Sequence, residues 1–185
     1  MTNATDTTTL AGDYTIDAAH SRLGFVARHA MVTKVRGAFN EFTGTGHLDT
    51  ADPSASHAEI TIKVDSIDTR NADRDNHLRS NDFFEMATYP EIRFVSTSVT
   101  PVDPATYRVR GDLTIKGTTR PVEIDFAYTG SAVDPFGNAR VGFEGAVTIN
   151  RKDWGLNWNA ALDAGGVLIS ENVVLEFEIS AIKNA

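Results

Sequence analysis

Apolar and polar residues alternate with a period of two along most of the chain, as in strands that have one buried and one solvent-facing side. In five segments Val, Ile, Leu, Phe or Tyr occupy nearly every second position. These segments lie near residues 60–64, 107–116, 122–128, 141–150 and 167–179. Further Val-, Phe- and Thr-rich segments fit the same scheme less regularly, at residues 13–18, 21–28, 36–48 and 91–99. The pattern predicts an antiparallel all-β protein of roughly eight strands.

The connections and the glycines favour a closed up-and-down barrel over a sandwich. Most connections are short turns such as Asp52-Pro53 and Lys116-Gly117, so consecutive strands should be neighbours in a meander. The strands are also long, and glycines occur inside them where a strongly bent strand needs them. These glycines are Gly24, Gly111, Gly142 and Gly145. An eight-stranded barrel is either filled by its own side chains or holds one small ligand, and inward Phe, Val and Ile would make its interior apolar.

Two longer segments, 70–87 and 151–166, break the alternation. From Asp73 onward the first has helix-compatible residues, and Asn71 is placed to cap a helix there. The second contains both tryptophans of the chain. Loops of this length are typically functional or unordered, so both are expected to cover one end of the barrel.

Composition narrows the class of function. The chain has 185 residues, a formal net charge of −8 and no cysteine, which excludes disulfides, thiolate metal sites and cysteine nucleophiles. We read the charge as evenly spread, so nucleic acid and anionic membrane surfaces are expected to be poor partners. No apolar run is long enough for stable membrane insertion, and no secretion signal is recognisable, so we expect a cytoplasmic protein. Residues 1–12 are predicted to be a disordered tail, and residues 13–185 a single domain.

Catalytic and metal-binding signatures are not found. The GxSxG, GxxxxGK[ST] and HExxH motifs are absent, and no spacing of histidines predicts a metal site. His20 and His29 have opposite parity and would face opposite sides of a regular strand. His77 follows Asp73 by four residues, a spacing that suits a local hydrogen bond or a carboxylate partner. We therefore predict no catalytic residue, no metal and no cofactor.

Beyond these patterns, the chain resembles the YceI-like family of lipocalin-like proteins, which bind polyisoprenoid lipids. The resemblance covers nearly all of the chain after residue 13, and its blocks follow the family's order. The most recognisable block is RDNHLRSNDFFEMATYP, at residues 74–90. The others are YTIDAAHSRLGFVARH at 14–29, continuing into VRGAF at 35–39, GDLTIKGTTRPV at 111–122 and INRKDWGL at 149–156.

The resemblance implies an extended eight-stranded antiparallel lipocalin-like barrel with a short helical segment near one end and an apolar tunnel. The implied ligand is a long-chain polyisoprenoid lipid, a polyprenyl compound or a quinone tail, held for storage, transport or sequestration. The predicted ligand-binding residues form the tunnel wall and its lid: Phe25, Phe39, Phe42, Phe94, Leu113, Ile115, Phe143, and Phe84, Trp154, Trp158. A polar head group would lie near His29, Arg74, His77 and Arg151, unless the two arginines form ion pairs with Asp75 and Asp153.

Two other functions stay open at this point. One is an enzyme that acts on an isoprenoid lipid, with a histidine as general base and a carboxylate that orients it. The other is an electron-transfer accessory that holds an isoprenoid quinone. The sequence does not fix the oligomeric state, a homodimer included, nor the chain length of the lipid.

Overall fold

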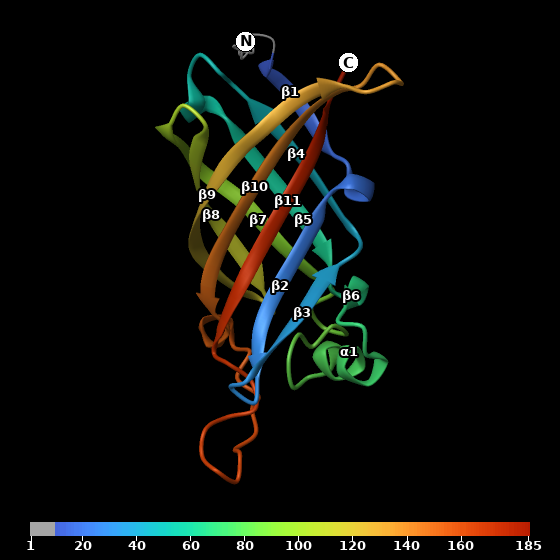
Figure 1. Ribbon diagram of the computed structural model, residues 1–185, viewed down its shortest axis with the longest axis vertical. Helices are drawn as coiled ribbons and strands as arrows, with labels where there is room; N and C mark the ends of the chain where they lie inside the picture. The colour runs from blue at the N-terminus through green and yellow to red at the C-terminus, as the bar shows by residue number, and fades with distance from the viewer. Residues whose placement is uncertain (1–9) are drawn as a thin grey trace.

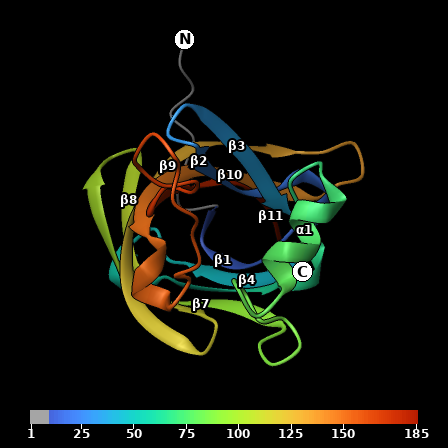
Figure 2. The same ribbon diagram turned by 90° about the horizontal axis from the view of Figure 1, so that it is seen from below.

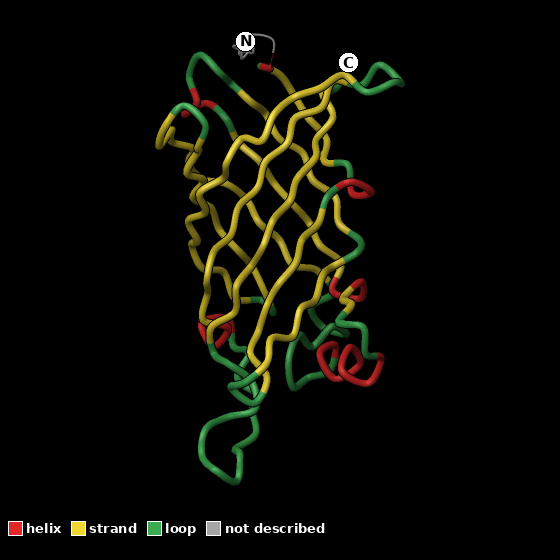
Figure 3. The backbone as a smooth tube through the Cα atoms, viewed as in Figure 1, coloured by secondary structure: helices red, strands yellow, loops and turns green. Residues whose placement is uncertain are grey.

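The computed structural model describes residues 10–185 and shows a long, narrow barrel of antiparallel strands (Figure 1). The strands wind obliquely around the long axis, as closure of a small barrel requires (Figure 3). The strands are β1 (Gly12–Ile16), β2 (Arg22–His29), β3 (Thr33–Phe39), β4 (Phe42–Leu48), β5 (His57–Lys63), β6 (Ile67–Asp68), β7 (Glu91–Asp103), β8 (Thr106–Ile115), β9 (Thr118–Val133), β10 (Ala139–Asn150) and β11 (Asn172–Lys183). The helical elements are α1 (Ala72–Arg79) and the 3-10 turns η2 (Ala18–His20), η3 (Pro53–Ala55), η4 (Val64–Ser66) and η5 (Arg151–Trp154).

These strands make an eight-stranded closed barrel. The number is eight because β1 and β2 together act as one interrupted strand, β3 and β4 act as another, and the short β6 is an addition to β3. β1 and β2 pair with successive parts of β11, with η2 between them. β3 and β4 likewise continue one another, pairing with β2 and β1. The sheet order runs β1-β4-β5-β7-β8-β9-β10-β11, and β1 pairs with β11 to close it. The predicted meander is confirmed for β7 to β11, which are sequential neighbours.

Strand pairing around the barrel is incomplete at the end that carries α1. There β3 pairs with β2 on one side but meets only the short β6 on the other, at Ala38–Asp68 and Phe39–Ile67. Beyond these pairs, no strand of the described chain continues this seam along β3. The segment around α1 lies beside it, and Phe84 packs edge-on against Phe39. Seen from this end, α1 lies at one side of the barrel opening (Figure 2).

The predicted helix and its cap are confirmed. α1 begins after Asn71, whose side-chain oxygen accepts the backbone N–H of Arg74 at 3.0 Å. This satisfies one of the free N–H groups at the start of a helix. Within residues 10–185, α1 and the other helical elements are all too short or too polar to span a membrane.

The predicted boundaries were wrong at the last strand. Alternation suggested a strand from residue 167, whereas β11 begins at Asn172. The cause is Asn159, whose side-chain amide accepts from the N–H of Ile169 at 3.0 Å and donates to its C=O at 2.7 Å. The backbone of Ile169 therefore forms hydrogen bonds to the side chain of Asn159, at the edge where a strand residue would bond the backbone of the adjacent strand. At the other end of the chain, residues 1–9 of the predicted tail lie outside the described residues, Leu10 is buried, and β1 already begins at Gly12.

Candidate functional site

An elongated cavity of about 470 Å³ occupies the barrel interior. Its wall comes from all eight strands and is almost entirely apolar. Along β11 every second residue, Val173, Leu175, Phe177, Ile179 and Ala181, faces it. Polar lining residues gather at the two ends. The barrel is thus lined by its side chains without being filled by them.

Two glycines leave room for phenylalanine rings to lie flat against the barrel wall. Phe25 on β2 lies directly opposite Gly37 on β3, and a Cβ on residue 37 would come within 2.3 Å of the ring. Phe94 leans over Gly111 in the same way, at 2.4 Å. With no side chain beneath them, the rings can lie against the wall, where they leave the centre of the barrel open.

Most of the predicted wall residues line this cavity. The structure brings together Phe25, Phe39, Phe94, Leu113, Ile115, Phe143, Phe84 and Trp158. Pattern reasoning did not single out the β11 residues as wall, although their period of two was visible in the sequence. That these side chains contact a ligand stays a prediction.

Two predicted residues, Phe42 and Trp154, lie outside the cavity lining. Phe42 begins β4 opposite Ile62 and is buried in the surrounding core. Trp154, in η5, is 3% exposed, and its indole N–H donates to the backbone C=O of Leu113 at 2.9 Å. A buried indole N–H requires an acceptor, and this one anchors η5 to β8. Both side chains therefore belong to the buried core that surrounds the cavity.

At the α1 end, a buried guanidinium points its donors at backbone carbonyls. Arg151 is 4% exposed and lines the cavity. It donates to the C=O groups of Ser170 at 2.9 Å, Leu156, and Ile169 at 3.5 Å. Burial lowers the pKa of Arg151, and the nearby Glu171 carboxylate acts in the opposite direction. The alternative of an ion pair with Asp153 is not realised: Arg151 forms no ion pair within residues 10–185.

Arg74 has a similar arrangement at the start of α1. Its Nε donates to Oγ1 of Thr69 at 2.8 Å, and its Nη2 to the C=O of Thr69 at 2.7 Å. The buried Asp75 accepts the backbone N–H and the hydroxyl of the same threonine. The alternative of an Arg74–Asp75 ion pair is therefore also wrong, because Thr69 separates the two groups. Arg74 and Arg151, like the third lining arginine Arg28, thus have no carboxylate directly paired to them within residues 10–185.

The two predicted histidines lie at this same end. His77 also lines the cavity, with its ring edge-on to Trp158 at 4.5 Å between centroids, and its Nε2 is 2.8 Å from Oδ2 of Asp82. Its carboxylate partner is therefore Asp82, and the alternative Asp73 was wrong. His29 ends β2, forms a bridge with Ile169 and also lines the cavity. All four predicted head-group residues thus lie around one opening, which α1 and η5 flank from different sides (Figure 2).

The opposite end has a histidine pair that sequence reasoning missed. His47 on β4 and His57 on β5 are direct cross-strand partners with rings stacked at 5.6 Å, and both line the cavity. Nδ1 of His47 is 2.7 Å from Oδ1 of Asp13. Only the strand register, which no local motif revealed, brings them together. Among residues 10–185 no group of three or more His, Cys, Asp or Glu side chains could hold a metal ion.

Comparison with known proteins fits this geometry. The model of the YceI-like domain matches residues 14–181. A UPF0312 protein of Staphylococcus aureus strain MSSA476 is 41% identical over 170 residues, covering 91% of this chain and 95% of the relative. Among solved structures, BcnA of Burkholderia cenocepacia has 25% identity and a TM-score of 0.79, covering 89% of this chain and 98% of its own. A polyisoprenoid binding domain from Saccharophagus degradans, implicated in plant cell wall breakdown, has 17% identity and a TM-score of 0.70, with 92% and 98% covered. The chain belongs to the YceI-like domain family.

Proposed function

We propose that the protein binds a long-chain polyisoprenoid lipid inside the barrel, for storage, transport or sequestration, and does not convert it chemically. The observation that carries the proposal is the elongated apolar cavity of about 470 Å³ with polar groups confined to its ends. This volume lies within the roughly 300–1,000 Å³ typical of small-molecule sites. The narrow shape suits a linear chain better than a fused-ring ligand.

The hydrophobic effect supplies the affinity. Burial of one CH₂ group contributes about 0.8 kcal/mol, so a five-carbon isoprene unit contributes roughly 4 kcal/mol before ordering costs. A few units inside the barrel therefore suffice for tight binding, even after the ordering of a flexible chain is subtracted. The shared fold with the Saccharophagus degradans domain supports the choice of an isoprenoid over other apolar chains.

The polar head group is proposed to lie at the α1 end, near His29, Arg74, His77 and Arg151. In the part of the chain that the structure describes, Arg74 and Arg151 have no carboxylate partner, and guanidinium groups form charge-assisted hydrogen bonds readily. A phosphate or a quinone carbonyl at this opening would accept such bonds. The opposite end, with its stacked histidine pair, would then receive the end of the chain.

Native mass spectrometry of the purified protein, followed by organic extraction, tests the proposal. We expect a co-purifying isoprenoid. Replacing Phe94 with Asp should abolish lipid retention, and Leu175→Trp should lower it by filling the cavity without adding charge. Phe136→Asp is the control, because Phe136 is 89% exposed on the β9–β10 connection. An unchanged lipid load in both folded cavity variants would overturn the proposal.

The enzyme alternative has one specific feature in its favour, the His77–Asp82 pair beside the cavity. A histidine oriented by a carboxylate is the usual form of a general base. Incubating the protein with an extracted or added isoprenoid and following the lipid by mass distinguishes the two functions. A binder returns the lipid unchanged, whereas turnover that is lost in His77→Gln would establish an enzyme.

A further inference from the structure

The hairpin of β2 and β3 concentrates positive charge in an otherwise acidic protein. No acidic residue occurs between Asp17 and Glu41, although the chain carries a net charge of −8. The same stretch contains four cationic side chains, Arg22, Arg28, Lys34 and Arg36. The even spread of charge expected from composition therefore does not hold at this hairpin.

Two of these cations face each other without a counter-ion. Arg28 and Lys34 are direct cross-strand partners, and both are exposed. Like charges placed directly opposite each other destabilise a strand pair. Farther from the turn, Arg22 and Arg36 share Glu176, at 3.5 and 3.7 Å. Arg28 donates from Nη1 to the C=O of Val32 at 3.4 Å, but neither Arg28 nor Lys34 forms an ion pair in the described chain.

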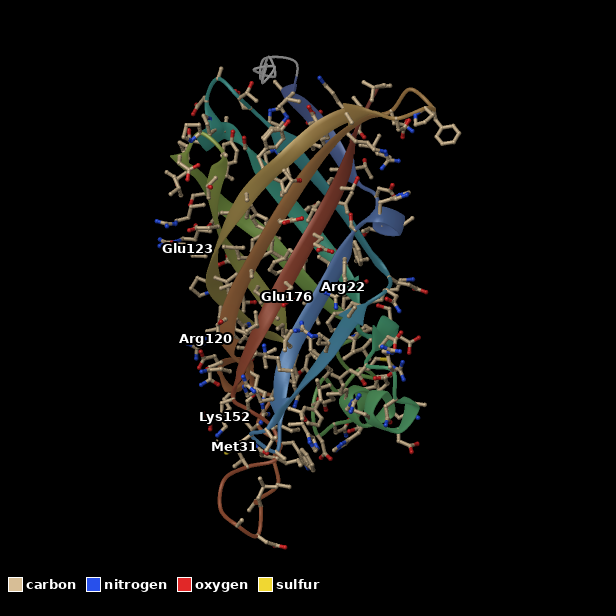
Figure 4. All side chains as sticks on the ribbon, viewed as in Figure 1. Arg22, Met31, Arg120, Glu123, Lys152 and Glu176 are labelled. Carbon is tan, nitrogen blue, oxygen red and sulfur yellow. The ribbon has the colours of Figure 1, made fainter. Side chains whose placement is uncertain are left out.

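The turn between them exposes apolar side chains. Met31 is 63% exposed and Val32 74% exposed, and Val167 on the neighbouring segment is also exposed. Ala30 and Met31 have φ values of 49° and 61°, a conformation in which tight hairpins favour Asn and Gly. We call Arg28, Met31, Val32 and Lys34 the basic tip. Figure 4 shows Met31 at the end of the barrel where the segment after η5 projects.

Protection of a sheet edge explains only part of this arrangement. β3 is an edge strand beyond its pairs with β6, and Lys34 and Arg36 discourage pairing with another chain there. Arg28 lies on β2, whose other side is covered by β11 and Ser170. Edge protection therefore accounts neither for Arg28 nor for the exposed Met31 and Val32.

The structure points to an anionic lipid surface as the partner of the basic tip. We propose that Met31, Val32 and Val167 enter the interface of such a surface while Arg28 and Lys34 contact lipid phosphates. Apolar side chains flanked by cations are the usual chemistry of peripheral membrane binding. The tip is also continuous with the cavity wall, to which Phe25 and Val35 belong, so docking places the cavity opening against the lipid.

The net negative charge does not oppose this contact. Charges are screened over about 8 Å at physiological ionic strength, and β9 alone has 16 residues, or roughly 50 Å of extended chain. Acidic residues on distant parts of the barrel are therefore not felt at the tip. Two acids at this end are already paired, Glu171 with Lys152 at 2.7 Å and Asp82 with His77 at 2.8 Å.

Sedimentation with lipid vesicles tests the proposal and needs no cargo in the barrel. The probe is vesicles of phosphatidylcholine with about one third phosphatidylglycerol, compared with phosphatidylcholine alone, at low and high salt. The wild type should sediment with the anionic vesicles and be released by salt. R28Q/K34Q should lower the partition coefficient roughly 25-fold, and M31S/V32S should lower it as well while keeping the charge.

Matched controls keep the result specific. R108Q/R110Q removes the same formal charge from the side of the barrel, where Arg110 pairs with Glu123; Figure 4 shows Glu123 on the side of the barrel, away from Met31. F136S removes an exposed aromatic side chain from a different hairpin. Both should bind vesicles as the wild type does. Equal binding to neutral vesicles, no binding at all, or equal losses in the controls would each overturn the proposal. Retention of a co-purified lipid is measured separately on the same proteins, so a barrel that holds lipid but ignores vesicles refutes docking alone.

Discussion

The Phe25–Gly37 contact makes a quantitative test of how the barrel interior is built. A Cβ on residue 37 would lie 2.3 Å from Cζ of Phe25 and 2.8 and 2.9 Å from its two Cε atoms, and these are the three nearest atoms. Gly37→Ala should therefore cost about 2 kcal/mol, because the ring is driven off the wall. Phe25→Ala alone should cost about 3 kcal/mol, the low end for Phe truncation, since the ring is only half-buried.

The double variant distinguishes this steric account from a general weakness of β3. Once the ring is absent, Ala at position 37 meets no obstacle and should add about 0.5 kcal/mol of stability over Gly. The coupling between the two substitutions is then about 2 to 3 kcal/mol. Urea unfolding measures it, with midpoint shifts of about 1 M at a typical slope. Additivity within about 0.5 kcal/mol would show that the contact does not set the position of the ring.

Three further predictions concern other parts of the molecule. Hydrogen bonds from Arg140 and Asn138 hold the pKa of Asp134 well below its usual range. The loss of stability in Asp134→Asn should therefore be constant above pH of about 4 and vanish as the pH falls further, because wild-type Asp134 then becomes protonated too. Unfolding curves recorded across this pH range measure the difference. Arg151→Met should destabilise the protein by roughly 1–3 kcal/mol, because it leaves buried carbonyls unpaired. The neighbouring Lys152 is exposed, so Lys152→Met should change the unfolding midpoint far less. Equal effects of the two substitutions would contradict the role assigned to the buried guanidinium. Asn71→Ala should cost about 1 kcal/mol and speed hydrogen exchange in α1, and unchanged exchange would show that the cap does not hold the helix start.

The features that the sequence predicted are those set by local pattern. The period of two placed the strands, and the Asn71 cap placed the start of α1, because both depend on residues only a few positions apart. The apolar interior followed from long strands with inward Phe, Val and Ile, whereas the open tunnel was implied by the resemblance to the YceI-like family. Leu113 and Ile115 on β8 line it, as their parity requires.

The features that were missed depend on contacts between distant residues. Phe39 lines the cavity and Phe42 does not, although the strand register places each opposite a lining residue. The indole of Trp154 finds its acceptor 41 residues away, at Leu113. The partners of Arg74 and Arg151 are a threonine and backbone carbonyls, groups that a search for opposite charges overlooks.

The seam between β3 and β6 is held by few backbone pairs, Ala38–Asp68 and Phe39–Ile67. The ladder between β10 and β11, by contrast, runs from Arg140–Ile182 to Asn150–Asn172. Separating β3 from β6 therefore breaks far fewer backbone hydrogen bonds than separating β10 from β11. We expect local opening of the barrel to begin at this seam, and its amide groups to exchange hydrogen faster than those of β10 and β11.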